Sequence, residues 1–305
     1  MSVLDAIGNT SLVRLRNVVP PGSAEVWVKL EWENPTGSMK DRMARAVIER
    51  AEADGRLRAG TTVVEYTGGS TGTSLAFVCA AKGHRIRIVT SDAFSQEKRD
   101  HMRAYGAELT LVPSEDGRTT KKLILDMIEA ARTIAAEPDT FWTDQLRNHD
   151  AIAGYHPLGE EIRRQMSGRV DAFVHSVGTA ASIRGVSQVL KGHDSAVRIV
   201  AVEPAESPVL SGGAPGPHKI EGVGIGYEPP LWNRADVDTI EAVATDEAKA
   251  MTRRLAREEG LFGGTSSGAN VIAALRLAAQ LGSGGRVVTL MCDSGLKYLS
   301  TDVYR

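Results

Sequence analysis

Short hydrophobic runs alternate along this chain with longer segments in which hydrophobic residues recur at helical spacing. The runs are rich in valine and isoleucine, as in strands that are buried on both faces. They predict strands at residues 62–65, 85–90, 108–112, 172–177, 197–202 and 286–291. The segments between them predict helices at 72–83, 96–105, 119–136 and 183–190, and Gly83 is placed to end the first of these.

This alternation of strand and helix favours parallel sheets that are covered by helices. It occurs in the middle of the chain and again in the second half, so we predict an α/β fold. The expected architecture is two three-layer α/β domains with mainly parallel sheets. Ligands of such sheets bind beyond the carboxyl ends of the strands, where the glycine-rich loops of this chain lie. We therefore expect the active site in the cleft between the two domains.

Composition limits the classes of partner. The 305 residues include 36 Lys and Arg against 38 Asp and Glu, which gives no electrostatic reason to expect nucleic acid or an anionic membrane. No hydrophobic run approaches the roughly 18 residues of a membrane span, and the start of the chain lacks a signal-peptide pattern. Cys79 and Cys292 form no CxxC motif, and the histidines show no metal-ligand spacing. We expect a reduced, cytoplasmic enzyme without a metal site.

A candidate catalytic lysine lies in the segment 34–42, which reads NPTGSMKDR. Ser38 followed by Asp41 fits a capping box that would begin a helix at Met39, behind a Pro/Gly turn. Lys40 would then lie in the first helical turn, where the helix dipole disfavours an ammonium. A neutral amine can attack an aldehyde, so Lys40 is a candidate Schiff-base residue. Taken alone, Lys40 is more typical of a surface lysine at a helix start.

Three loops of small residues join a predicted strand to a predicted helix. The segment 67–72 reads TGGSTG, and its amides and hydroxyls suit a carboxylate or phosphate at a helix N-terminus. The segment 177–182 reads VGTAAS, and its successive amides form an anion nest to which Thr179 and Ser182 add hydroxyl donors. The third, 263–268, reads GGTSSG and also fits a simple glycine turn with capping serines. Read singly, the first two loops fit ligand-free turns as well.

The combination of these features is more informative than any one of them. None of the loops is G-x-G-x-x-G or GxxxxGK[ST], so dinucleotide and nucleoside-triphosphate sites lose their main support. Two anion-binding loops and a candidate Schiff-base lysine indicate one ligand that carries both an aldehyde and a phosphate. Pyridoxal phosphate has both groups.

Together these segments resemble the cysteine synthase (O-acetylserine sulfhydrylase) and cystathionine β-synthase family. The members are fold-type II pyridoxal-phosphate enzymes with a tryptophan synthase β-like fold. The likeness covers nearly the whole chain. It is strongest at 34–42, at 216–224, which reads GPHKIEGVG, and at 266–268, which reads SSG.

The resemblance implies a role for each matching position. Lys40 is the expected Schiff-base lysine and proton shuttle, and Ser266 is the expected serine facing the pyridine nitrogen. That neutral serine favours β-elimination or β-replacement over transamination. The other positions fall into three groups. The phosphate cup comprises Gly178, Thr179, Ala180, Ala181 and Ser182, and the substrate loop with its partner glutamine comprises Thr67, Gly68, Ser70, Thr71 and Gln145. The glycine-rich loop opposite the cofactor runs from Gly222 to Gly226. Ser70 is expected to contact the cofactor as well.

Two loops depart from the family's pattern. The usual Ser-Gly-Asn of the substrate loop reads Gly68-Gly69-Ser70, which removes one hydroxyl from the carboxylate grip and shortens the contact to the cofactor. The usual Gly-Gly-Thr of the phosphate cup reads Ala180-Ala181-Ser182. This second change requires that neither alanine take a positive φ.

The resemblance also implies the domains and the reaction. A smaller N-terminal α/β domain at 36–150 would carry the substrate loop, and 1–35 plus 151–305 would carry the phosphate cup. The expected reaction is a β-replacement that forms L-cysteine from O-acetyl-L-serine and sulfide through an aminoacrylate intermediate. The family further implies a homodimer, with serine acetyltransferase as a candidate partner.

Other functions remain open at the level of the sequence. The changes at Gly68 and Ser70 are compatible with another donor or nucleophile, such as O-phosphoserine, homocysteine giving cystathionine, or an amine giving diaminopropionate. A nucleotide-dependent oxidoreductase lacks its glycine fingerprint here. A catalytically inert regulatory homologue is disfavoured by the intact lysine motif.

Overall fold

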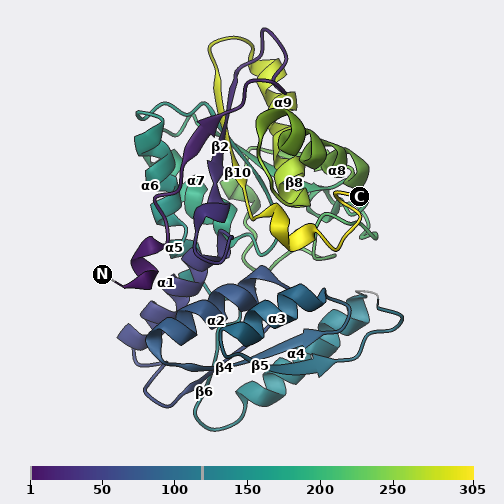
Figure 1. Cartoon of the computed structure of the whole chain (residues 1–305). Coiled ribbons are helices and arrows are strands. Elements are labelled where there is room, and N and C mark those ends of the chain that lie inside the picture. Colours follow the sequence, from purple (N-terminus) through teal and green to yellow (C-terminus); the bar gives the residue numbers. More distant parts are fainter. Residues whose placement is uncertain (1, 118–119) are drawn as a thin grey trace. The chain divides into compact units, whose positions relative to one another are not determined.

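The computed structural model describes residues 2–117 and 120–305, which form two compact units (Figure 1). The first unit comprises Met1–Ile7 and Lys40–Gly154, and the second comprises Gly8–Met39 and Tyr155–Arg305. The chain therefore passes from the second unit into the first between Met39 and Lys40. Each unit is built on its own sheet.

The first unit has a four-stranded parallel sheet in the order β5-β4-β3-β6. Its strands are β3 (Thr62–Tyr66), β4 (Arg85–Ser91), β5 (Glu108–Val112) and β6 (Thr140–Trp142). The helices are α1 (Lys40–Ala53), α2 (Ser70–Lys82), α3 (Gln96–Ala104), α4 (Lys121–Ala135) and α5 (Asp150–Ala153), with a 3-10 turn at Val3–Ala6. The first residue predicted for α4, Thr119, lies outside the described residues.

Helices cover both faces of this sheet. Helix α1 packs against α2, and α2 packs against α3. Helix α2 also packs on β3 and β4, and α4 packs against all four strands (Figure 1). Consecutive strand residues point to opposite faces, yet Val63, Val64 and Glu65 are all fully buried. The central strand, β3, is therefore covered on both faces, as its hydrophobic run predicts.

The second unit has a six-stranded sheet in the order β1-β2-β10-β7-β8-β9. Its strands are β1 (Leu12–Arg14), β2 (Glu25–Leu30), β7 (Ala172–Ser176), β8 (Arg198–Pro204), β9 (Thr239–Val243) and β10 (Arg286–Met291). Only β1 pairs in the antiparallel sense, with β2. The prediction of an α/β fold with mainly parallel sheets is confirmed.

The helices of the second unit flank this sheet, with α6 (His156–Gln165) and α7 (Ala181–His193) on one side and α8 (Thr245–Arg254) and α9 (Thr265–Leu281) on the other (Figure 1). A π-helical turn, Leu255–Glu259, follows α8. Short 3-10 turns lie at Glu31–Glu33, Val209–Ser211, Arg234–Asp236 and Gly295–Tyr298. Apolar residues of β2, β7, β8, β10 and α9 form one buried cluster, which holds the carboxyl ends of the strands and the start of α9 in a fixed arrangement.

The crossing of α8 and α9 depends on one glycine. A Cβ on Gly268 would lie 2.1 Å from the backbone oxygen of Ala248 and 2.3 Å from Oγ1 of Thr252, both in α8. We predict that Gly268→Ala lowers the free energy of unfolding by about 1–3 kcal/mol, because the two helices must separate. The control is Gly192→Ala in α7, where nothing lies within 4 Å and helix propensity favours alanine by up to about 1 kcal/mol. Denaturant unfolding of both variants checks this; equal stability of the two would contradict it.

Candidate active site

Lys40 is the first residue of α1, and its side chain is half-buried. The segment before it is fixed at the carboxyl end of β10, since Met39 N–H donates to the oxygen of Cys292 at 3.0 Å and Ser294 N–H donates to the oxygen of Gly37 at 3.0 Å. The helix begins at Lys40, one residue later than predicted. The prediction that Lys40 lies in the first turn of the helix is confirmed.

The predicted substrate loop joins β3 to α2 in the first unit. The hydroxyl of Thr71 donates to Oε1 of Gln145 at 2.8 Å, and Nε2 of Gln145 donates to the oxygen of Tyr66 at 3.0 Å. Thr67 Oγ1 accepts from the amide of Gly69 at 3.1 Å. The structure thus brings the loop and Gln145 together although they are far apart in sequence.

A buried carboxyl group that the sequence analysis missed supports this loop. Glu65 is fully buried at the end of β3 and accepts from the Thr143 hydroxyl at 2.6 Å, the Gln145 amide at 3.0 Å and the Tyr66 amide at 2.9 Å. Burial raises the pKa of the Glu65 carboxyl to about 7, against the opposing effect of these donors. The signal available in the sequence was a glutamate inside an otherwise apolar strand. Glu65 ties the start of the segment that contains Gln145 to the end of β3.

Gly68 lies against an aromatic ring from the neighbouring loop. Phe94 follows β4, which pairs with β3, and a Cβ on Gly68 would lie 2.3 Å from its Cε1 atom. The next residue, Gly69, meets only ordinary contacts from Lys98 at 3.6 Å. The departure from serine at position 68 therefore has a steric reason. Phe94 was not identified from the sequence.

The predicted phosphate cup, 178–182, joins β7 to α7 in the second unit. The first backbone hydrogen bond of this turn runs from Arg184 N–H to the oxygen of Ala180 at 3.1 Å. The amides before Arg184 come before the first helical hydrogen bond. They have no acceptor within α7 and are available to an external acceptor. The helix has 13 residues, so its N-terminus also offers the dipole that favours an anion.

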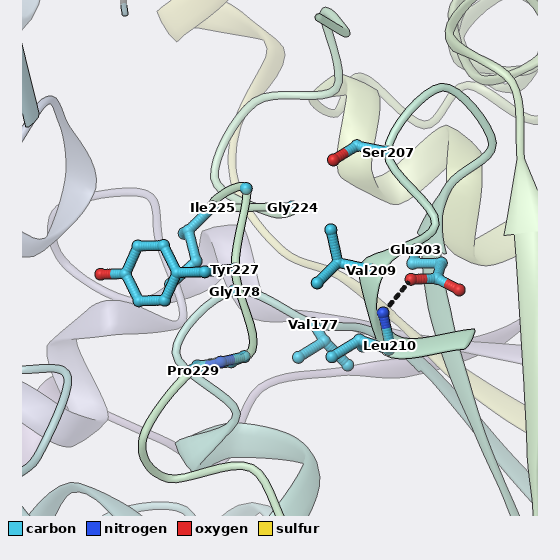
Figure 2. A pocket seen from close by; sticks show the side chains of 11 residues that line it. Val177, Gly178, Glu203, Ser207, Val209, Leu210, Gly224, Ile225, Tyr227 and Pro229 are labelled. Carbon is cyan, nitrogen blue, oxygen red and sulfur yellow. Dashed lines mark hydrogen bonds between the residues drawn. The ribbon is translucent and has the colours of Figure 1, made fainter. Parts of the chain in front are cut away.

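A second loop lies directly against the cup. A Cβ on Gly178 would lie 2.4 Å from the oxygen of Gly222, and Gly224 N–H donates to the oxygen of Val177 at 3.1 Å. Figure 2 shows a small pocket beside this contact, lined by Gly178 and by the residues from Gly224 to Tyr227. On its far side the buried carboxylate of Glu203 accepts from the amide of Leu210 at 2.7 Å. The pairing of Gly178 with Gly222 leaves no room for a side chain at 178.

Ser266 lies in the first turn of α9 and is buried. The hydroxyls on either side of it have structural partners: Thr265 Oγ1 accepts from the Glu221 amide at 3.0 Å, and Ser267 Oγ accepts from the Cys292 amide at 3.0 Å. The first contact joins α9 to the loop that contains Gly222. Within the second unit, the cup, this loop and the start of α9 are therefore connected.

The expectation for the two alanines of the cup is wrong at one position. Ala180 has a φ of 71°, in the left-handed region, and forms the N-cap of α7. A side chain in this conformation costs roughly 1–2 kcal/mol. Ala181, in contrast, begins the helix with ordinary backbone angles. The cup therefore retains the backbone shape that suits glycine, at a cost in strain.

Two absences complete the description of the site. Among residues 2–117 and 120–305, no three His, Cys, Asp or Glu side chains are grouped as a metal site requires. Over the same ranges, no helix has the length and apolar character needed to cross a bilayer.

Ala180→Gly should relieve the strain in the cup. We predict a gain of about 1 kcal/mol in the free energy of unfolding, because glycine takes a positive φ without a Cβ clash. The matched control is Ala181→Gly, which should lose about 0.5–1 kcal/mol because it places glycine in a helix. Denaturant midpoints of the two holoenzymes test this. A loss at position 180 as large as that at 181 would show that the left-handed conformation carries no strain.

Gly68→Ser should disturb the contact with Phe94. We predict a loss of about 1–3 kcal/mol in stability from overpacking, most of which is recovered when Phe94→Ala is added. The control is Gly69→Ser, where a Cβ would meet only ordinary contacts from Lys98. Thermal unfolding of the single and double variants gives the coupling energy; strictly additive effects would refute the proposed contact.

Comparison with known proteins agrees with this geometry. A family model described as pyridoxal-phosphate dependent enzyme matches residues 3–293. A cysteine synthase of Staphylococcus aureus is 44% identical over 306 residues, covering 99% of this chain and 96% of that protein. The crystal structure of a cysteine synthase from Entamoeba histolytica has a TM-score of 0.94 at 36% identity and covers 99% of this chain and 90% of that one.

A third relative carries a different activity in its name. It is the O-acetylserine dependent cystathionine beta-synthase from Helicobacter pylori, with a TM-score of 0.92 at 35% identity, covering 100% of this chain and 98% of that one. The match to the family model extends over nearly all of this chain, and the relatives match it over almost their full length. This chain belongs to the family of pyridoxal-phosphate dependent enzymes.

Proposed function

We propose that this enzyme forms L-cysteine from O-acetyl-L-serine and sulfide, with release of acetate. The support is twofold: relatives named cysteine synthase match over 99% of the chain, and Lys40 is fixed at the start of α1 directly after the segment bonded to β10. The position of Lys40 is the observation on which the proposal depends. The enzyme uses pyridoxal phosphate, which supplies an aldehyde for amines and an electron sink at the substrate's α-carbon.

The residues of the second unit fit this cofactor. A phosphate needs several donors at close range, and 178–182 offers the free amides of a helix N-terminus together with the hydroxyls of Thr179 and Ser182. Position 178 has to be glycine, because a Cβ there would lie 2.4 Å from the oxygen of Gly222. Ser266 offers a neutral hydroxyl to a pyridine nitrogen and so leaves that nitrogen largely unprotonated. This suits a reaction in which the leaving group departs as the α-proton is removed.

Lys40 has two roles in the proposed reaction. Its amine would hold the cofactor aldehyde in the resting enzyme, and once the substrate amine occupies that position the freed Lys40 amine would take the proton from the substrate's α-carbon. Acetate leaves from the β-carbon, sulfide adds at the same carbon, and Lys40 returns the proton to the α-carbon. The N-terminal end of α1 favours the neutral amine that both tasks require.

The substrate loop would hold the amino-acid carboxylate. Thr67, Gly68, Ser70 and Thr71 present amides and hydroxyls at the start of α2, and Gln145 is already bonded to Thr71. Ser70 would reach the cofactor as well. We propose that the smaller domain, 36–150, carries this loop and that the larger domain, 1–35 plus 151–305, carries the phosphate cup. A cytoplasmic homodimer that binds serine acetyltransferase remains part of the proposal.

Removal of the Lys40 amine tests the proposed function. Lys40→Ala should abolish cysteine formation from O-acetylserine and sulfide, and it should remove the visible absorption band of the lysine-bound cofactor. The control is Lys122→Ala, which removes an exposed lysine that pairs with Asp126 in α4 and should leave both readouts unchanged. A Lys40→Ala enzyme with normal turnover would overturn the assignment.

The same assay separates the proposed substrate pair from its alternatives. O-acetylserine and O-phosphoserine are offered as donors, and sulfide, homocysteine and a diaminopropionate-forming amine as nucleophiles, with products identified by mass. We expect the highest kcat/KM with O-acetylserine and sulfide. A clear preference for another pair would retain the cofactor chemistry and replace the proposed reaction.

A further inference from the structure

A buried histidine in the strand before the phosphate cup contacts the cup. His175 lies in β7 and is 2% exposed, and its Nε2 atom lies 2.8 Å from Oγ of Ser182, which is 8% exposed in the first turn of α7. The ring also packs against Phe173, with centroids 5.9 Å apart. A buried polar pair of this kind needs a defined donor and acceptor. The sequence analysis assigned no role to His175.

The surroundings of the ring determine which nitrogen carries the proton. The side chain of Asn270 is oriented by two contacts: its Oδ1 accepts from the Ser176 amide at 2.7 Å, and its Nδ2 donates to the oxygen of Leu290 at 2.9 Å. That Nδ2 atom lies 3.5 Å from Nδ1 of His175. One hydrogen of Nδ2 goes to Leu290, and the other is shared between Sγ of Cys292, at 3.4 Å, and Nδ1 of His175, so we assign Nδ1 as the acceptor of the ring.

The proton of the neutral ring is therefore on Nε2, which donates to Oγ of Ser182. With its oxygen accepting this bond, the Ser182 hydroxyl can direct its own hydrogen away from the ring. Serine lacks the branch at Cβ that restricts the χ1 angle of threonine, so this hydroxyl needs an external restraint to keep one orientation. His175 supplies that restraint from a strand in the centre of the sheet.

We propose that His175 is a positioning residue of the phosphate cup, which fixes the Ser182 hydroxyl as a hydrogen-bond donor to the cofactor phosphate. This inference rests on the assignment of 178–182 as the cup, and it does not depend on which donor or nucleophile the enzyme uses. Hydrogen bonds to a charged group contribute more than neutral ones. Loss of the restraint should therefore be measurable as weaker cofactor binding.

The experiment measures the dissociation constant of pyridoxal phosphate by equilibrium dialysis of the holoenzyme, for His175→Ala, Ser182→Ala and the double variant. We expect each single variant to weaken binding by about tenfold or more, as for one hydrogen bond to a charged group. The double variant should bind as weakly as Ser182→Ala, because His175 acts through Ser182. His175→Gln, which keeps a donor, should recover most of the affinity.

The control is His193→Ala at the exposed end of the same helix, which should leave the affinity unchanged. Phosphorus NMR of the bound phosphate adds a second readout, since a change in its donors shifts the resonance in the His175→Ala and Ser182→Ala holoenzymes alike. If His175→Ala fails to fold, His175→Gln and Ser182→Ala still decide: a Gln variant as weak as Ser182→Ala would overturn the proposal.

The possible outcomes distinguish a failure of this inference from a failure of the cup assignment or of the proposed reaction. Normal affinity in His175→Ala with weak binding in Ser182→Ala would overturn the role of His175 alone, as would fully additive losses in the double variant. Normal affinity in both single variants would overturn the cup assignment itself. Turnover with an unexpected substrate pair would overturn the proposed reaction and leave the role of His175 intact.

Discussion

The first amides of a helix have no acceptor within that helix, and the chemistry proposed for this enzyme depends on that constraint. In parallel sheets each strand leads into a helix, so α2 and α7 begin just beyond the carboxyl ends of β3 and β7. The leading amides that have no acceptor in the protein are available to a ligand or water. Small residues at these junctions allow close approach, as the contact between Gly178 and Gly222 illustrates.

The loops of this chain differ from the family's pattern, and three of the differences have a neighbour that accounts for them or carry a cost. Glycine at 68 is matched by the ring of Phe94, which occupies the space of a side chain. Serine at 182 is matched by His175, which restrains its hydroxyl. Alanine at 180 has no such compensation and keeps a left-handed backbone.

The sequence was sufficient to predict the strands buried on both faces, because their hydrophobic runs are continuous. The strand β2 escaped prediction because the charged Lys29 interrupts its hydrophobic run; this lysine is buried, and its charge is paired with Glu161 at 2.7 Å. The positions of Lys40, the cup and the loop with Gln145 followed from local patterns and the family resemblance. The parts played by Glu65, Phe94 and His175 depend on contacts between residues distant in the chain or on backbone angles, which no local pattern encodes.

The central claim is that the amine of Lys40 carries the cofactor. Reduction of the purified holoenzyme with borohydride fixes the cofactor to its lysine, and proteolysis followed by mass spectrometry then locates it. The account predicts a phosphopyridoxyl group on the peptide that contains Lys40 and on no other lysine peptide. A label on a different lysine, or an unmodified Lys40 in an enzyme that retains its cofactor, would contradict it.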